Sequence, residues 1–173
     1  MTLLLRLGFL LFLGLAVLSW LKKDALPAAE DILPQLQRPP QQKPIEHGPL
    51  HVEKDGTRYT VQPLFSYSLR GLVVSCHDTS SWLDYMHGAW GDTLNVRDLC
   101  VLWGENVKNG LYHDFSFKSG DFTCFFKTNK RAAWSAFRTD QIANNHLLAA
   151  TAQIQNKIAH AEHGDQIAFK GFL

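Results

Sequence analysis

The longest uninterrupted apolar run of the chain lies at its N-terminus. Residues 3–21 are apolar except for Arg6 and Ser19, and a helix of about 20 such residues spans the hydrocarbon core of a bilayer. A cleavable signal peptide needs small residues in an Ala-x-Ala pattern, whereas the stretch after Trp20 reads Leu-Lys-Lys-Asp-Ala-Leu-Pro-Ala-Ala. The pattern therefore predicts a retained transmembrane helix over residues 1–23.

The next segment, residues 24–55, shows no apolar periodicity and is rich in proline and glutamine. Proline disfavours helix and favours an extended chain. We therefore expect a stalk that holds a domain away from the membrane, or a disordered linker with no other task. The prolines that carry this prediction are Pro34, Pro39, Pro40, Pro44 and Pro49.

From residue 56 the pattern changes to short segments of alternating apolar and polar residues, which are typical of strands. The run from Leu99 to Trp103 is apolar at every position, which predicts a central strand covered on both faces. Ser119-Gly120 separates two aromatic-rich segments and predicts a hairpin. Strand patterns cover residues 59–61, 67–73, 99–103, 111–118, 121–127 and 165–173, and helical spacing covers 130–138 and 151–164.

These elements predict one globular α+β domain over residues 56–173. The expected architecture is a mostly antiparallel sheet or partly open barrel with two or three short helices, preceded by the transmembrane helix. The last strand pattern runs to Leu173 without a following turn, so we also expect the domain to be truncated at its C-terminus.

Charge excludes some classes of partner. The chain has 17 Lys and Arg against 16 Asp and Glu, a formal net charge of +1. Because positive and negative residues are interspersed along the chain, we expect no positive electrostatic potential that would hold nucleic acid. Aromatic residues are abundant after Tyr59, so we expect the domain to fold without a cofactor.

Five segments of the chain form an ordered set: Tyr67–Ser75 (YSLRGLVVS), Asp98–Gly104 (DLCVLWG), Gly120–Cys124 (GDFTC), Asn144–Leu148 (NNHLL) and Gly164–Ile167 (GDQI) continuing to Gly171. Together they resemble a family of bacterial membrane-anchored envelope proteins that have no assigned activity. The resemblance covers most of residues 59–173 and implies a membrane-anchored envelope protein, but no chemistry. Family members continue beyond the position of Leu173, so the resemblance implies that this chain is short at its C-terminus.

The chain has three cysteines, Cys76, Cys100 and Cys124, with wide spacing. Structural zinc sites use paired short spacings, so a zinc site is not expected. In an oxidising compartment Cys100 and Cys124 are the candidate disulfide. The alternative is that both are buried as small apolar residues.

Cys76-His77-Asp78 has the residue types of a nucleophile, a base and an orienting acid. Neighbouring residues on a strand point to opposite faces, so these three cannot converge as a triad requires. We therefore do not expect catalysis at this position.

Two further groups are weak candidates for a site. His160 and His163 have the i, i+3 spacing at which two imidazoles can hold one metal ion, but a third ligand is missing nearby and a histidine near a helix C-terminus is common. Trp90, in a predicted loop, is the candidate for an exposed binding surface, although tryptophans more often lie in the core.

Asn144-Asn145-His146 is the most polar motif between the two helical patterns. As a brace, the asparagines would cap helix ends and His146 would bond a carbonyl. As a catalytic site, His146 would be a general base in an open cleft. No nucleophile can be assigned from the sequence, which favours the brace.

The sequence thus favours a non-catalytic binding or assembly module, and the alternative is a small membrane-tethered hydrolase using His146. We expect attachment to the bacterial inner membrane through residues 3–21, with one pass and a periplasmic domain. The expected partner is another envelope protein.

Overall fold

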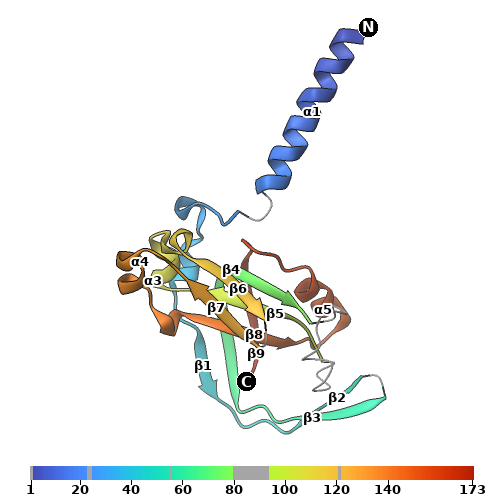
Figure 1. The fold of residues 1–173 in the computed structure, drawn as a ribbon. Helices are drawn as coiled ribbons and strands as arrows, with labels where there is room; N and C mark the ends of the chain where they lie inside the picture. Colours follow the sequence, from blue (N-terminus) through green and yellow to red (C-terminus); the bar gives the residue numbers. More distant parts are fainter. Residues whose placement is uncertain (1, 23–24, 55, 80–93, 121) are drawn as a thin grey trace.

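The computed structural model describes residues 2–22, 25–54, 56–79, 94–120 and 122–173. A five-stranded antiparallel sheet forms the centre of the domain, and a long helix projects away from it (Figure 1). The sheet consists of β1 (Gln41–Pro44), β4 (Phe65–Asp78), β5 (Asn95–Leu102), β8 (Ile142–Leu148) and β9 (Gln166–Phe172).

The long strand β4 organises this sheet, because other strands pair along both of its edges. Tyr67 has β1 on one side and β9 on the other, whereas Leu72 has β5 on one side and β9 on the other. Strands β1 and β5 therefore follow one another along a single edge of β4. The sheet continues from β5 to β8, with Cys100 opposite Asn144.

One face of the sheet carries the larger core. Leu72, Val74, Cys100 and Leu102 point toward this face and are fully buried. The elements that contribute to this core are η2 (Pro34–Gln37), α3 (Glu105–Lys108), η3 (Leu111–Asp114), the hairpin of β6 (Ser116–Gly120) and β7 (Thr123–Lys127), and α4 (Arg131–Ala136).

The opposite face carries a second core, built around Leu69, Val73, Leu99 and Val101. Helix α5 (Ala152–Ala159) lies against β5 at this face, and its N-cap is Thr151, whose side chain accepts a hydrogen bond from the backbone N–H of Ile154. With both faces covered, β5 is the central strand that its uninterrupted apolar pattern predicts.

Residues 25–54 differ from the expected stalk, because they pack on the domain. Leu36 is 2% exposed and lies in the larger core. The buried Tyr112 donates a hydrogen bond to the Pro27 carbonyl at 2.7 Å, and burial, followed by Glu30 and Asp31, raises its pKa. Proline-rich chain can contribute single apolar anchors and a short edge strand, which composition does not reveal. The other elements here are η1 (Ala29–Asp31) and β2 (Leu50–Lys54), which pairs with β3 (Thr57–Val61).

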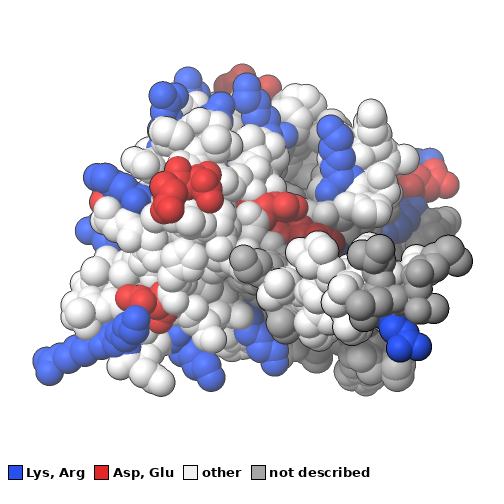
Figure 2. Space-filling view, turned by 90° about the horizontal axis from the view of Figure 1, so that it is seen from above, with Lys and Arg blue, Asp and Glu red and all other residues white. Residues whose placement is uncertain are grey.

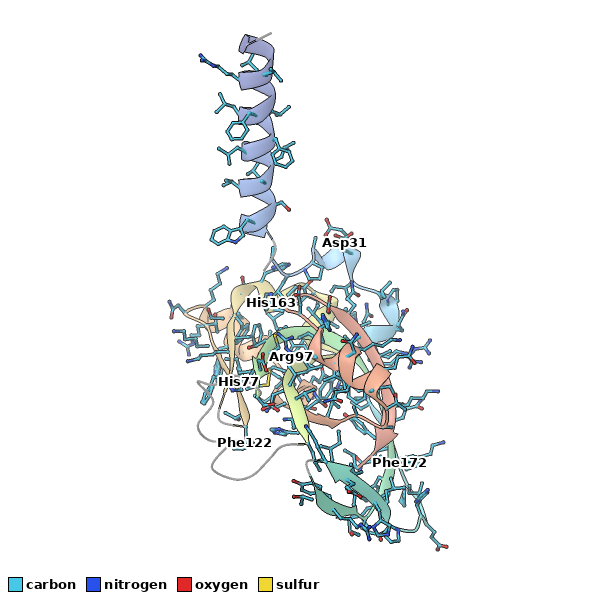
Figure 3. All side chains as sticks on the ribbon, turned by 90° about the vertical axis from the view of Figure 1, so that its right-hand side faces the viewer. Asp31, His77, Arg97, Phe122, His163 and Phe172 are labelled. Carbon is cyan, nitrogen blue, oxygen red and sulfur yellow. A yellow bond between two sulfur atoms is a disulfide. The ribbon has the colours of Figure 1, made fainter. Side chains whose placement is uncertain are left out.

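The prediction of a transmembrane helix is wrong. In the described part of the chain, no helix is long and apolar enough to cross a membrane. Helix α1 (Thr2–Lys22) carries exposed apolar side chains around its circumference (Figure 3). The assignment as a membrane protein with a signal-anchor therefore loses its support. The assignment to the periplasm and cell envelope loses the support that it took from this anchor.

The α+β class with antiparallel sheets is confirmed, and among the described strands the sheet does not close into a barrel. Two local predictions differ from the structure. Residues 111–114 form a short 3-10 helix, and residues 142–148 form the strand β8, after η4 (Thr139–Gln141). Strand β8 contains two asparagines, which have low strand propensity, so its local pattern did not indicate a strand.

Candidate functional site

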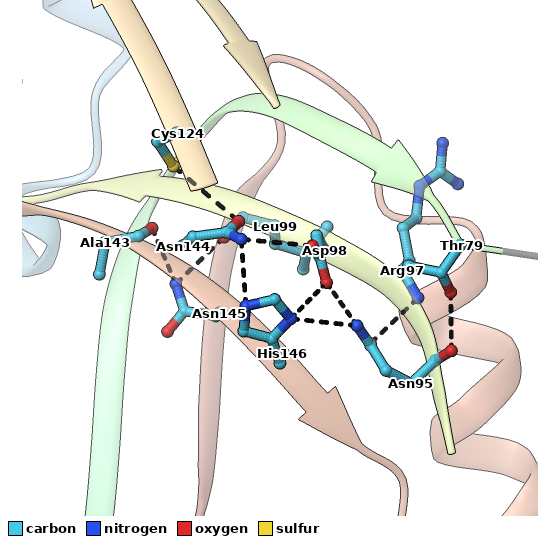
Figure 4. Close-up of polar contacts among 10 residues, drawn as sticks. All are labelled: Thr79, Asn95, Arg97, Asp98, Leu99, Cys124, Ala143, Asn144, Asn145 and His146. Carbon is cyan, nitrogen blue, oxygen red and sulfur yellow. Dashed lines mark hydrogen bonds and ion pairs between the residues drawn. The ribbon is translucent and has the colours of Figure 1, made fainter. Parts of the chain in front are cut away.

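A buried carboxylate, Asp98, is the centre of the polar group that contains His146 (Figure 4). Asp98 is 0% exposed, and its Oδ1 lies 2.8 Å from His146 Nδ1. The two residues face each other in the register of β5 and β8. The His146 side chain is 37% exposed, so this pair connects a buried charge with the protein surface.

Two asparagines also donate hydrogen bonds to Asp98. Asn95 is 4% exposed, and its Nδ2 donates to Asp98 Oδ1. Asn144 Nδ2 donates to Asp98 Oδ2 at 3.3 Å. Burying a carboxylate is costly unless it is paired and hydrogen-bonded, and these two amides with the imidazole meet that requirement.

The hydrogen bonds indicate the tautomer of His146. Nδ1 faces the Asp98 carboxylate and must donate to it, because a carboxylate only accepts. Nε2 lies 3.3 Å from Asn144 Nδ2, which donates, so Nε2 is the accepting nitrogen. Both ring nitrogens are therefore bonded within the protein.

Strand alternation separates the residues of the Asn144-Asn145-His146 motif. Asn144 and His146 point toward Asp98, whereas Asn145 points to the other face and bonds the carbonyls of Leu99 and Ala143. The motif does not lie in a loop that caps helices, as the sequence suggested, because β8 pairs with β5 along its length. The sequence analysis did not identify Asp98 as the centre of this polar group. The available signal was a charged side chain at the start of an apolar strand.

A disulfide lies beside this group. Cys100 and Cys124 are bonded, with Cα atoms 5.7 Å apart, and this bond ties β7 to the central strand β5. Cys124 Sγ also lies 3.9 Å from Asn144 Oδ1. Because the disulfide sulfur carries no hydrogen, this approach is a packing contact and no hydrogen bond.

The turn of the β6–β7 hairpin places Phe122 against His146, with ring centroids 5.6 Å apart. The turn joins Gly120 to Thr123, later than the predicted Ser119-Gly120. Phe122 has a φ of 62°, which is unfavourable for a residue with a Cβ. Such strain persists only where surrounding contacts impose it, and here they include the aromatic contact with His146.

Cys76, His77 and Asp78 lie on β4 and alternate between faces. His77 is opposite Asp98 and Asp78 is opposite Arg97 in the register of β4 and β5. Cys76 accepts a hydrogen bond from the Arg97 guanidinium at 3.4 Å and is not in a disulfide. The three side chains therefore do not form a triad.

The candidate metal ligands lie at the end of α5. His160 Nδ1 bonds the carbonyl of Asn156 at 2.7 Å, as expected for a histidine at a helix C-terminus. Within the described ranges, no cluster of three or more His, Cys, Asp or Glu residues could hold a metal ion. Trp90 lies outside the described residues.

A separate cleft lies between α5, the end of β2 and the ends of β4 and β5. Its volume is about 490 Å³. None of the Asp98 group lines it. The lining residues are Lys54, Asp78, Val96, Ala152, Gln155, Asn156 and Ala159.

The surface charge is mixed. Figure 2 looks down on the side from which α1 projects and shows Lys and Arg around the rim with Asp and Glu between them. On this face the described residues form no extended patch of one sign.

No family model, curated protein or solved structure matches the chain. The function is therefore argued from the residues and their geometry.

Proposed function

We propose that the chain is a non-catalytic binding domain that works in an oxidising compartment. The observation that carries this proposal is the saturated bonding of His146. Its Nδ1 bonds the buried Asp98 and its Nε2 accepts from Asn144, so the imidazole keeps no lone pair for a substrate. A general base needs a free lone pair within reach of the proton it takes.

The Asp98 group acts instead as a brace between the central and outer strands. It satisfies a buried charge and fixes the register of β5 and β8 through side chains from both. Buried polar networks that are fully satisfied make a fold rigid and unique. A rigid sheet suits a domain that presents binding surfaces.

The Cys100–Cys124 disulfide supports the proposal of an oxidising compartment, because disulfides persist outside the reducing cytosol. The test is alkylation of thiols in whole cells quenched with acid, before and after reduction. We expect one reactive cysteine, Cys76, before reduction and three after it. In the Cys76→Ala variant none should react before reduction. Three reactive thiols before reduction would contradict the proposal.

Catalysis is tested directly with the full chain and chromogenic ester, phosphate-ester, glycoside and peptide substrates. We expect no turnover above background. His146→Ala should lower the free energy of unfolding by about 1.5–3 kcal/mol, because a hydrogen bond to a buried charge is lost. A turnover that disappears in His146→Ala would replace the binding proposal with an enzymatic one.

A small hydrolase is the second candidate. It is favoured by the 2.8 Å contact between Asp98 and His146 Nδ1. In hydrolases with a catalytic triad, a carboxylate bonded to Nδ1 orients the histidine that acts as the base. This candidate requires Asn144 to release Nε2. Among the described residues no hydroxyl or thiol is bonded to His146, so the nucleophile would be water.

The protein partner expected from the sequence remains a proposal. Strand β8 ends the described sheet on one side. An edge strand can pair with an extended segment of a partner, whose main chain supplies the hydrogen bonds.

A further inference from the structure

We infer that the outer face of the β6–β7 hairpin is a docking surface for an acidic segment of a partner protein. This inference rests on the proposed binding function and adds a surface and a partner chemistry to it. The outer face consists of the hairpin side chains that point away from the sheet and are exposed, which are Ser116, Lys118, Thr123, Phe125 and Lys127.

The inner face of the hairpin is anchored to the domain. Phe117, Cys124 and Phe126 pack against the larger core, and Cys124 is bonded to Cys100 of the central strand β5. Because neighbouring positions on a strand point to opposite faces, the side chains at the intervening positions point outward. A surface held in this way loses little conformational freedom when a partner binds, which favours affinity.

The outer face combines an exposed aromatic ring with two cations. The register places Lys118 directly opposite Phe125, and Lys127 lies two positions further along β7 on the same face. Opposite side chains on antiparallel strands have Cβ atoms about 5 Å apart, and diagonal neighbours are about 7–8 Å apart. Phe125 is 51% exposed, so a partner that covers its ring also reaches both lysines.

Neither lysine is neutralised by an acidic side chain. In the described part of the chain Lys118 and Lys127 form no ion pair, whereas Lys130, three positions after Lys127, pairs with Asp114 at 2.6 Å. The five outer-face side chains include no acid. This face is therefore positive although the whole chain carries a net charge of only +1. A positive surface selects a negative partner, because complementary charges steer and orient the two surfaces.

The small extent of the charge favours a protein segment over a nucleic acid. Domains that bind nucleic acid carry clustered lysines and arginines, because each phosphate contact uses a cation. The outer face offers two. Alternate side chains of an extended segment are about 7 Å apart, which matches the distance of roughly 7–8 Å between diagonal positions such as Lys118 and Lys127. Two carboxylates of one segment can thus meet both lysines, and an apolar residue of the same segment can cover Phe125.

The experiment measures binding of the full chain to a dye-labelled random copolymer of glutamate and tyrosine by fluorescence anisotropy. We expect saturable binding that weakens at least about tenfold at about 1 M salt, where screening limits charge interactions to about 3 Å. A copolymer of lysine and tyrosine should not bind. Absence of binding to the acidic copolymer, or tighter binding of a single-stranded oligothymidine, would overturn the inference.

Charge reversal locates the surface. The double variant Lys118→Glu with Lys127→Glu should bind the acidic copolymer at least about tenfold more weakly, a loss of about 1.4 kcal/mol. The control is Lys43→Glu with Lys170→Glu, which makes the same change of net charge at exposed positions of β1 and β9. This control should change binding less than about twofold. Equal weakening by the two double variants would overturn the assignment to the hairpin.

The aromatic ring is tested separately from the charges. Phe125→Ala should weaken binding of the glutamate–tyrosine copolymer by about threefold to tenfold, because a contact between aromatic rings is lost, and should leave binding of poly-glutamate unchanged. An equal effect on both polymers would overturn the role of the ring. Turnover that depends on His146 would overturn the proposed function, whereas loss of binding at the hairpin alone would overturn only this inference.

Discussion

At the scale of single residues, the buried Asp98 carboxylate needs hydrogen-bond donors that the fold must supply. It accepts hydrogen bonds from His146, Asn95 and Asn144 and is closed to solvent. Asp98→Asn keeps the volume but turns one acceptor into a donor that faces other donors. We expect the free energy of unfolding in urea to fall by about 1.5–3 kcal/mol.

The matched control for this change is Asp114→Asn. The Asp114 side chain is 34% exposed and pairs with Lys130 at 2.6 Å. An exposed ion pair contributes about 0–1 kcal/mol, so this variant should be nearly neutral. Equal losses for the two variants would show that Asp98 is not the centre of a buried network.

Phe122 gives a second prediction at this scale, because its φ of 62° favours glycine. Both Phe122→Gly and Phe122→Ala lose the ring contact with His146. Only alanine keeps the steric cost of the left-handed region, roughly 1 kcal/mol. Thermal unfolding should therefore find the glycine variant more stable than the alanine variant.

Phe125 is the control for the effect of glycine. It lies on β7, is 51% exposed and has ordinary strand geometry. In a strand, glycine is less stable than alanine by about 0.5–1 kcal/mol, so the order of the two variants should reverse. The same order at both positions would argue against strain at Phe122.

At the scale of elements, the close approach of β4 to β5 depends on Gly71. A Cβ added there would meet Val101 Cγ1 and would lie 2.5 Å from the backbone oxygen of Leu102. Because backbone cannot yield as a flexible side chain does, Gly71→Ala should cost about 1–3 kcal/mol in urea unfolding. Gly171→Ala on β9 is the control, since nothing lies within 4 Å of its added Cβ. A neutral Gly71→Ala would mean that the two strands separate easily.

At the scale of the whole molecule, the Cys100–Cys124 bond joins the hairpin to the central sheet across 24 residues. Replacing both cysteines by alanine should lower the free energy of unfolding by about 3 kcal/mol, because the unfolded chain regains the entropy of an open loop. A reductant should destabilise the wild type and leave the double variant unchanged. The Cys76→Ala variant should respond to the reductant as the wild type does, and identical melting of oxidised and reduced wild type would contradict the prediction.

Local patterns in the sequence were sufficient for the central part of the fold. The apolar run from Leu99 to Trp103 indicated a strand covered on both faces, because a position exposed to water would have interrupted it. The helix after Thr151 and the last strand were also indicated by their spacing. In contrast, the tightly packed Leu36 could not be distinguished from the residues of a flexible linker, because a single apolar anchor has no periodicity.

The polar group around Asp98 and the cleft beside α5 could be identified only from the tertiary structure. Asp98 and His146 are 48 positions apart, and the register that brings them together follows from strand pairing that neither segment encodes locally. The motif lies between α4 and α5 along the chain, as expected, but its asparagines do not cap helix ends, because β8 pairs with β5. The cleft is a volume that small side chains leave open where β2 meets α5, and such a space arises from packing between elements that are far apart in the chain.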